Sequence, residues 1–277
     1  MKKVLVVEDD RSLSHMLCGM LETAGYQVTG TGDGLEALKL LRRRSFDLVL
    51  LDVRLPGISG LDVLAQLPAK KRRPTAIVMT SDDTPETVLR AVREQAYRYA
   101  RKPISADQVI ALVEEALSPR PDAQEIEVLS ARPEWVELLV PCDLSAADRI
   151  HSFLQQLEAD LSEAVRDSVA RAFRELLLNA IEWGGRMDPA RKVRISYLRA
   201  RRMLLYRIAD PGPGFDLGNL PHAAVSNPAD KPFEHMKARG EMGMRPGGFG
   251  LLLVRANVDE LLFNEARNEV VFVKYLD

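Results

Sequence analysis

The sequence predicts an α/β protein of two domains, in which a doubly wound parallel sheet of five strands precedes a two-layer α+β domain. Strand and helix patterns alternate through the first 117 residues, and helices grouped ahead of paired strands follow. Between them, "SPRPD" (118–122) places two prolines among polar residues, which is typical of a short, semi-stiff linker. We therefore expect domains at 1–118 and 124–277, joined by a linker at 119–123.

Continuous apolar runs indicate two buried strands in the first domain. The segments "KVLVV" (3–7) and "DLVLLDV" (47–53) lack the alternation of a half-exposed strand, so we expect both faces of each to be covered. Further strands are predicted at 26–30, 75–80 and 97–100. Helical patterns follow the strands in turn, at 13–21, 35–41, 58–66, 84–95 and 105–117. Five such units predict a parallel sheet with helices on both faces.

The second domain begins with helical segments and ends with strands. An apolar run, "WVELLVP" (135–141), precedes two long helical segments at 145–159 and 162–183. Paired strands are predicted at 192–198, 203–209, 259–264 and 269–276, with a helix at 249–257. The stretch 216–247 is polar, with scattered glycine, proline and methionine. This order favours an α+β layer over a second doubly wound sheet.

Composition excludes several classes of function. Among the 277 residues, 46% are hydrophobic, which is enough for real cores, and the net charge of −2 does not predict nucleic-acid or membrane binding. Cys18 and Cys142 lie far apart and in no metal-binding spacing, so we expect two reduced thiols. No apolar stretch is long enough to cross a bilayer, and we expect a cytoplasmic protein.

Charged and polar side chains follow four strands of the first domain at the edge where functional groups gather. Glu8, Asp9 and Asp10 follow the first strand, Asp52 ends the third, Thr80 and Ser81 end the fourth and Lys102 follows the fifth. Clustered carboxylates repel one another unless a cation joins them, and hard oxygen ligands suit Mg²⁺. A carboxylate beside Mg²⁺ could accept a phosphoryl group, with Thr80 and Lys102 holding its oxygens. For any one of these residues alone, a strand-end cap or a surface charge is the favoured interpretation, but the four strand ends together favour a site.

Four motifs together resemble the receiver domain of two-component response regulators. The motifs "VVEDD", "LVLLDVRLPGISG", "VMTSDD" and "ARKPIS" carry the resemblance, which covers residues 2–117 and implies the flavodoxin-like receiver fold. It implies that a sensor histidine kinase phosphorylates Asp52. It further implies that Asp9 and Asp52 ligate Mg²⁺, with Glu8 acting nearby and the Arg54 carbonyl as a third ligand.

The same resemblance implies a switch. Thr80 and Tyr99 would form the switch pair, and Lys102 would contact the phosphoryl group. The surface around 84–95, 97–100 and 105–117 would change with phosphorylation, so we expect it to contact the second domain or a second receiver in a homodimer.

Polar residues also flank a predicted buried helix in the second domain. In "RELLLNAIEWGG" (174–185), Glu175, Asn179 and Glu182 fall on one side of the apolar stripe at about 100° per residue. Such a flank could meet either solvent or a ligand. "ADPGPGFD" then places Asp210, Gly212 and Gly214 directly after a strand, where glycines permit a tight turn.

A third stretch, "RPGGFGLLLVR" (245–255), puts glycines before an apolar helix. Exposed backbone N–H groups at a helix N-terminus are suited to anions, although no Gly-Lys-Ser/Thr follows and the motif is not a P-loop. In this order the three stretches resemble the Bergerat-type ATP-binding fold, and most of all the anti-sigma-factor serine kinases, over residues 124–277. Trp183 departs from the histidine that relatives often carry.

The second resemblance implies roles for the polar residues. It assigns Asn179 to Mg²⁺, Glu175 to general base and Asp210 to the adenine amino group. It assigns Gly212 and Gly214 to the adenine turn. It assigns Gly248 and Gly250 to the phosphates, and 216–247 to the ATP lid.

Together the two resemblances imply a response regulator whose output is a serine/threonine kinase requiring ATP and Mg²⁺. The expected partner is an anti-sigma-factor antagonist or a sigma factor. No helical hairpin with a phosphorylatable histidine precedes the ATP domain, which argues against a histidine kinase. A partner-sequestering switch without phosphotransfer, or a bare ATPase, remains an alternative. Glu175 favours the kinase, because a pure binder needs no base.

Overall fold

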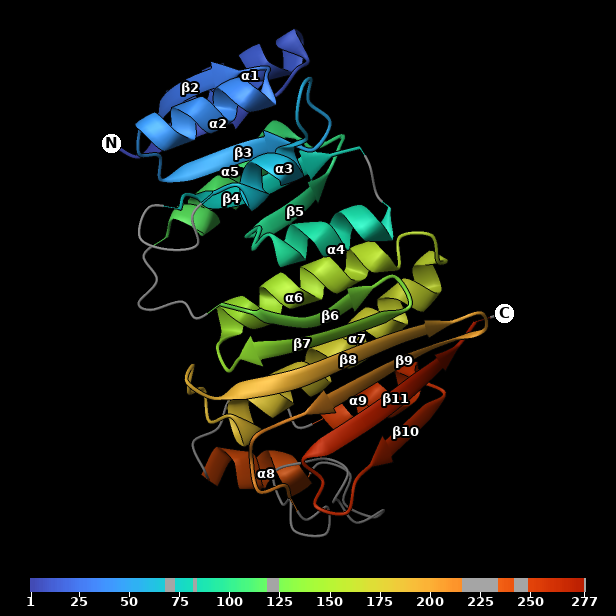
Figure 1. Cartoon of the computed structure of the whole chain (residues 1–277). Helices are drawn as coiled ribbons and strands as arrows, with labels where there is room; N and C mark the ends of the chain where they lie inside the picture. Colours follow the sequence, from blue (N-terminus) through green and yellow to red (C-terminus); the bar gives the residue numbers. More distant parts are fainter. Residues whose placement is uncertain (68–72, 82–83, 119–124, 216–233, 242–248, 277) are drawn as a thin grey trace. The chain divides into compact units, whose positions relative to one another are not determined.

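A computed structural model of the chain describes residues 1–67, 73–81, 84–118, 125–215, 234–241 and 249–276 (Figure 1). The chain divides into two compact units, Met1–Asp122 (unit 1) and Ala123–Asp277 (unit 2). The predicted linker 119–123 lies outside the described residues. In the described ranges no helix combines the length and the apolar character that crossing a bilayer requires.

Unit 1 is a parallel five-stranded sheet in the order β2-β1-β3-β4-β5. The predicted doubly wound fold is confirmed, because each strand is followed by a helix. In chain order the elements are β1 Lys3–Val7, α1 Arg11–Thr23, β2 Gln27–Thr31, α2 Gly34–Arg43, β3 Leu48–Asp52, α3 Gly60–Ala65, β4 Thr75–Thr80, α4 Pro85–Arg93, β5 Arg98–Arg101 and α5 Ala106–Leu117.

Alternate residues of the central strands pack against helices on opposite faces of the sheet. On one face, α1 and α5 pack on the strands through buried apolar side chains, which are Leu17, Leu21, Val109 and Val113 against Val4, Val6, Leu48, Leu50, Ile77 and Met79. On the other face, α2 packs beside α3. The central strands β1 and β3 are therefore almost wholly buried, which accounts for their continuous apolar runs.

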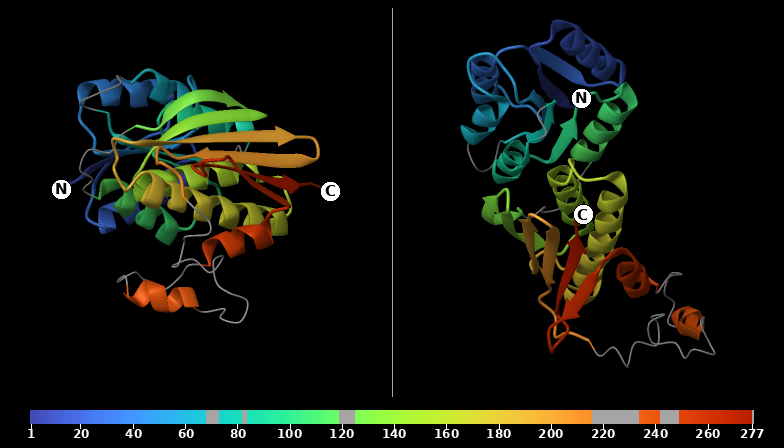
Figure 2. Two further views of the ribbon diagram at one scale, coloured as in Figure 1. Left: turned by 90° about the horizontal axis from the view of Figure 1, so that it is seen from below. Right: turned by 90° about the vertical axis from the view of Figure 1, so that its right-hand side faces the viewer.

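Unit 2 is a six-stranded antiparallel sheet in the order β10-β11-β9-β8-β7-β6. Helices α6 and α7 lie side by side on one face, and α9 packs against α7 (Figures 1 and 2). Its elements are β6 Glu127–Arg132, β7 Trp135–Pro141, α6 Leu144–Leu157, α7 Glu163–Asn179, β8 Lys192–Ala200, β9 Met203–Ala209, α8 Glu234–Glu241, α9 Gly250–Asn257, β10 Glu260–Phe263 and β11 Glu269–Tyr275.

Two of these elements were not expected from the sequence. Strand β6, "EVLSAR", is an edge strand with a register shift between Val128 and Ser130, so it carries neither an apolar run nor a clean alternation. Helix α8 lies within the polar stretch 216–247 and has no apolar face that could signal it. The rest of that stretch, 216–233 and 242–247, lies outside the described residues.

The long helix predicted at 162–183 changes its winding near its end. Helix α7 stops at Asn179, and a π-helical turn, Ala180–Gly184, follows it. The Gly185 N–H donates to the Ala180 carbonyl at 2.8 Å, which is the wider spacing of a π-turn. The 100° periodicity that placed Glu182 beside Asn179 therefore does not hold beyond residue 180.

A buried carboxyl group sits in the aromatic core of unit 2. Glu158 is 1% exposed and accepts a hydrogen bond from the Tyr206 hydroxyl at 2.5 Å. Tyr206 stacks on Phe272 and meets Tyr197 edge-on. Burial raises the pKa of Glu158 from 4.5 to about 7, against the opposing effects of the Tyr206 hydrogen bond and nearby arginines.

Candidate functional sites

The ends of three parallel strands bring two acids and a lysine of unit 1 into contact. Glu8 directly follows β1, Asp52 ends β3 and Lys102 directly follows β5. Lys102 Nζ lies 2.5 Å from Glu8 Oε2 and 2.7 Å from Asp52 Oδ2, and all three side chains are largely buried. Burial lowers the pKa of Lys102, but its bonds to Asp52 and Glu8 outweigh this and the net shift is upward. Burial also raises the pKa of Glu8 against the influence of Lys102.

A third carboxylate completes a cluster that could hold a cation. Oxygen atoms of Glu8, Asp9 and Asp52 lie within 4.8 Å of one another. Asp10 does not belong to this cluster, and its Oδ1 caps α1 by accepting from the N–H groups of Ser12 and Leu13. Oxygen donors at this spacing fit Mg²⁺.

A surface hollow opens beside this cluster, and Arg54 lines part of it. The hollow is lined by Asp9, Val53, Arg54, Leu55, Pro56 and Ser59. The Arg54 N–H donates to Asp52 Oδ1 at 3.2 Å, and the Arg54 guanidinium contacts the Ser81 hydroxyl. No contact in the described structure tests the Arg54 carbonyl as a ligand, so that role stays a prediction.

The predicted switch residues lie on the neighbouring strands β4 and β5. Thr80 ends β4 and is fully buried, while Tyr99 lies in β5 opposite Val78 and is 4% exposed. The sequence reasoning missed Gly60, where an added Cβ would lie 2.0 Å from the Asp52 carbonyl oxygen. A glycine after the serine cap of α3 was the available signal.

In unit 2, Glu175 and Asn179 lie one turn apart on α7 beside the start of α9. Asn179 Nδ2 is 3.5 Å from Glu175 Oε1, and both residues are half-buried. Gly250 is the first residue of α9, and a Cβ there would lie 1.9 Å from Glu175 Oε1. The backbone at the start of α9 therefore rests directly on the Glu175 side chain. Gly248 lies outside the described residues.

Asp210 follows β9 and is held by backbone rather than by a charged side chain. Its Oδ1 accepts from the Gly212 N–H at 2.7 Å. A Cβ on Gly184 would lie 2.2 Å from Asp210 Cγ, so only glycine fits at the end of the π-turn. Burial raises the pKa of Asp210 against the Gly212 bond and the charge of Arg191. Gly184 lies in the "WGG" at 183–185 and was not predicted as a site residue.

Two family models divide the chain in the same way. The receiver domain of response regulators matches residues 4–114, and the histidine kinase-like ATPase domain matches residues 140–274. MtrA of Mycobacterium leprae, a DNA-binding response regulator, is 35% identical over 186 residues, which are 67% of this chain and 80% of MtrA. The chain belongs to the response regulators. Its second unit is a histidine kinase-like ATPase domain, which implies ATP binding, and its receiver implies a histidine kinase as phosphodonor.

Other relatives of this response regulator match less than half of the chain. The sensory transduction protein RegX3 of Mycolicibacterium smegmatis is 39% identical over 117 residues, which are 42% of this chain and 51% of RegX3. Among solved structures, the HemR receiver domain of Leptospira biflexa is 30% identical and covers 44% of this chain and 98% of its own, with a TM-score of 0.41. A receiver domain protein from Methanospirillum hungatei is 25% identical and covers 42% of this chain and 94% of its own, with a TM-score of 0.40.

Proposed function

We propose that phosphorylation of Asp52 controls an ATP-dependent serine/threonine protein kinase in unit 2, acting in the cytoplasm on an anti-sigma-factor antagonist-type partner. The observation that carries the proposal is the pairing of Glu175 with Asn179 beside the start of α9. An amide that can ligate a metal, next to a carboxylate that can take a proton, suits phosphoryl transfer to a hydroxyl. Binding of nucleotide alone would need only the amide.

In unit 1 the reaction begins with an Asp52 oxygen attacking the phosphorus of a phosphohistidine on the sensor kinase. The P–N bond breaks and the histidine keeps the electron pair. Lys102 lies where it can hold the transferred group, because it already contacts the Asp52 carboxylate. Asp9 and Asp52 would ligate Mg²⁺, with Glu8 nearby, and the bound ion would offset the negative charge. Thr80 and Tyr99 are proposed as the switch pair.

In unit 2 we propose a role for each polar residue and glycine of the candidate site. Asp210 accepts a hydrogen bond from the adenine amino group, and Gly212 and Gly214 form the turn beneath the base. Gly248 and Gly250 bind phosphates, and Asn179 would ligate Mg²⁺. Glu175 takes the proton of the acceptor hydroxyl as the oxygen of that hydroxyl attacks the γ-phosphorus of ATP. The bond between the γ-phosphorus and the β–γ bridging oxygen breaks, and ADP leaves with its electron pair.

Phosphotransfer separates the kinase from the alternatives. The whole chain is incubated with Mg²⁺, ATP labelled at the γ-phosphate and small candidate proteins of the antagonist type. We expect label on a serine or threonine of one partner. Glu175→Gln should abolish this transfer and keep ATP affinity, because it removes the base but not the pocket. Glu182→Gln, which changes a carboxylate within the π-turn, is the matched control and should transfer normally.

Each other outcome contradicts part of the proposal. A partner that binds in the presence of ATP without receiving label would support a sequestering switch, and release of inorganic phosphate with no partner would support a bare ATPase. Transfer that persists in Glu175→Gln would remove Glu175 as the base. A folded wild-type chain that binds no nucleotide would end the kinase and the switch together.

A further inference from the structure

The hairpin between β10 and β11 holds the turn that follows β9. The Asp210 N–H donates to the Asn268 carbonyl at 2.8 Å, and Asn268 Nδ2 donates to the Gly212 carbonyl at 3.0 Å. Gly214 adopts a left-handed φ of +85°, and a Cβ there would lie 1.6 Å from the Ala266 carbonyl oxygen. The turn is therefore supported by the hairpin at both of its ends.

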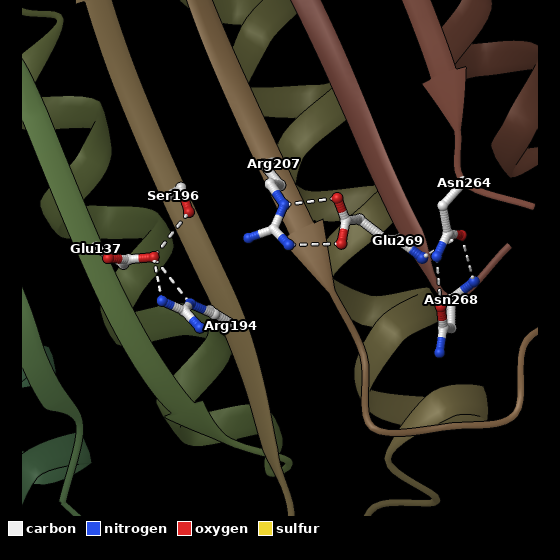
Figure 3. Close-up of polar contacts among 7 residues, drawn as sticks. All are labelled: Glu137, Arg194, Ser196, Arg207, Asn264, Asn268 and Glu269. Carbon is white, nitrogen blue, oxygen red and sulfur yellow. Dashed lines mark hydrogen bonds and ion pairs between the residues drawn. The ribbon is translucent and has the colours of Figure 1, made fainter. Parts of the chain in front are cut away.

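The Asn268 side chain is itself fixed by Asn264 from the other side of the hairpin (Figure 3). Asn264 Nδ2 donates to Asn268 Oδ1 at 2.8 Å, while Asn264 Oδ1 accepts from the backbone N–H groups of Asn268 and Glu269, both at 3.1 Å. Because its oxygen accepts from Asn264, the Asn268 amide presents its NH₂ group to Gly212. Glu269 is anchored in turn by two 2.6 Å bonds from Arg207.

These contacts form a chain that ends on the Asp210 carboxylate. Asn268 holds the carbonyl of Gly212, and the N–H of Gly212 holds Asp210 Oδ1. The two groups belong to the peptide units on either side of the Gly212 Cα, so holding both restricts its φ and ψ. Glycine has the widest conformational freedom of all residues, so this restriction has to come from neighbouring groups.

We propose that Asn268, oriented by Asn264, is a positioning residue for adenine recognition. It holds the Gly212 peptides in the orientation that directs the Asp210 carboxylate toward the 6-amino group of the base. The inference rests on the proposed function, in which Asp210 recognises adenine, and it adds a specificity determinant from a distant part of the chain. A residue of the hairpin between the last two strands of unit 2 thereby contributes to nucleotide specificity.

The test compares ATP with purine riboside triphosphate, which lacks the 6-amino group. Calorimetry on the whole chain measures the dissociation constant of each nucleotide with Mg²⁺. The wild type should prefer ATP. Asn268→Ala should reduce that preference about tenfold, the factor for one lost hydrogen bond, and leave the affinity for the analogue unchanged. Asn264→Ala should act in the same direction, because it frees the Asn268 amide to rotate.

Controls separate positioning from loss of structure. Asn257→Ala removes an asparagine of unit 2 whose side chain donates to the Leu253 carbonyl of its own helix, and it should leave the preference unchanged. Asn268→Ser serves if the alanine variant does not fold. Equal loss of both nucleotides, or an unchanged preference in a folded variant, would overturn the role of Asn268 alone. A wild type that does not distinguish the two nucleotides would overturn the role of Asp210 and this inference together.

Discussion

The candidate phosphoacceptor site of unit 1 and the candidate nucleotide site of unit 2 hold their central carboxylates by different means. Asp52 meets the ammonium group of Lys102 at 2.7 Å, and Glu8 shares the same lysine. Asp210 instead accepts from the Gly212 backbone and packs against Gly184. The first site depends on side-chain charge, whereas the second depends on how closely the backbone can approach. The two should therefore respond to different substitutions.

The largest effect is expected from removing the candidate phosphoacceptor. Asp52→Asn should reduce labelling by acetyl phosphate and Mg²⁺ to background, because an amide oxygen is a far weaker nucleophile than a carboxylate. Labelling is measured on the intact protein by mass spectrometry. Asp107→Asn, at an exposed position on α5, is the matched control and should be labelled like wild type. Equal labelling of Asp52→Asn and wild type would show that another residue accepts the phosphate.

Removing the shared cation tests whether unit 1 depends on charge. Lys102→Met leaves the Asp52 and Glu8 carboxylates buried without their partner, which should cost about 3–5 kcal/mol without Mg²⁺. Hydrogen exchange of β1 and β3 amides reports the stability of unit 1 separately. Added Mg²⁺ should restore part of the loss. Lys39→Met, at an exposed position on α2, should have little effect, and an equal effect of both variants would remove the distinction between the sites.

Unit 2 contains a buried carboxyl group without a lysine partner, and its stability should depend on pH. The folded pKa of Glu158, about 7, lies above its ordinary value of 4.5, so the stabilisation is complete below 4.5 and is lost as the pH rises through about 7. We expect the free energy of unfolding to fall by about 3 kcal/mol from pH 5 to pH 8. Urea unfolding followed by tryptophan fluorescence reports unit 2, because Trp135 and Trp183 both lie there. Glu158→Gln should abolish this fall, and an unchanged pH profile in that variant would assign it to other groups.

The smallest effect is expected from replacing single glycines by alanine, at one position where the backbone packs closely on Asp210 and at one where it does not. Gly184→Ala should weaken ATP binding by about 1–3 kcal/mol, since its Cβ would collide with Asp210. Gly19→Ala in α1 meets nothing within 4 Å and should stabilise the helix by about 0.5–1 kcal/mol with no effect on ATP. Calorimetry and thermal unfolding of both variants give the two numbers. Normal ATP affinity in Gly184→Ala would show that the π-turn can move away from Asp210.

The first site could be located from sequence because the topology of a parallel sheet brings strand ends together. Once β1, β3 and β5 are recognised, Glu8, Asp52 and Lys102 must emerge at one edge. Which of the two neighbouring acids, Asp9 or Asp10, joins the cluster was not predictable in the same way. Asp9 joins the cluster whereas Asp10 caps α1, and this depends on where the helix begins.

The second site was only partly predictable, because its segments are distant in the sequence and meet through backbone. Helical periodicity predicted that Glu175 and Asn179 share a flank of α7, and the structure places them 3.5 Å apart. It could not predict the π-turn after Asn179, since the stretch "AIEWG" differs little from ordinary helix. The bond from Asn268 to Gly212 spans 56 residues and has no local signal.

The sequence by itself determined the two fold classes, the order of most elements and the chemical identity of the groups at each site. Local patterns suffice for these, because burial sets the periodicity of strands and helices and because turn residues mark their ends. Only the tertiary structure decided that Lys102 bridges two acids, that Gly184 and Gly250 admit no side chain, and that Asn268 supports the turn after β9. Those features depend on contacts a few ångströms long between segments far apart in the chain, and such contacts exist only once the whole unit has packed.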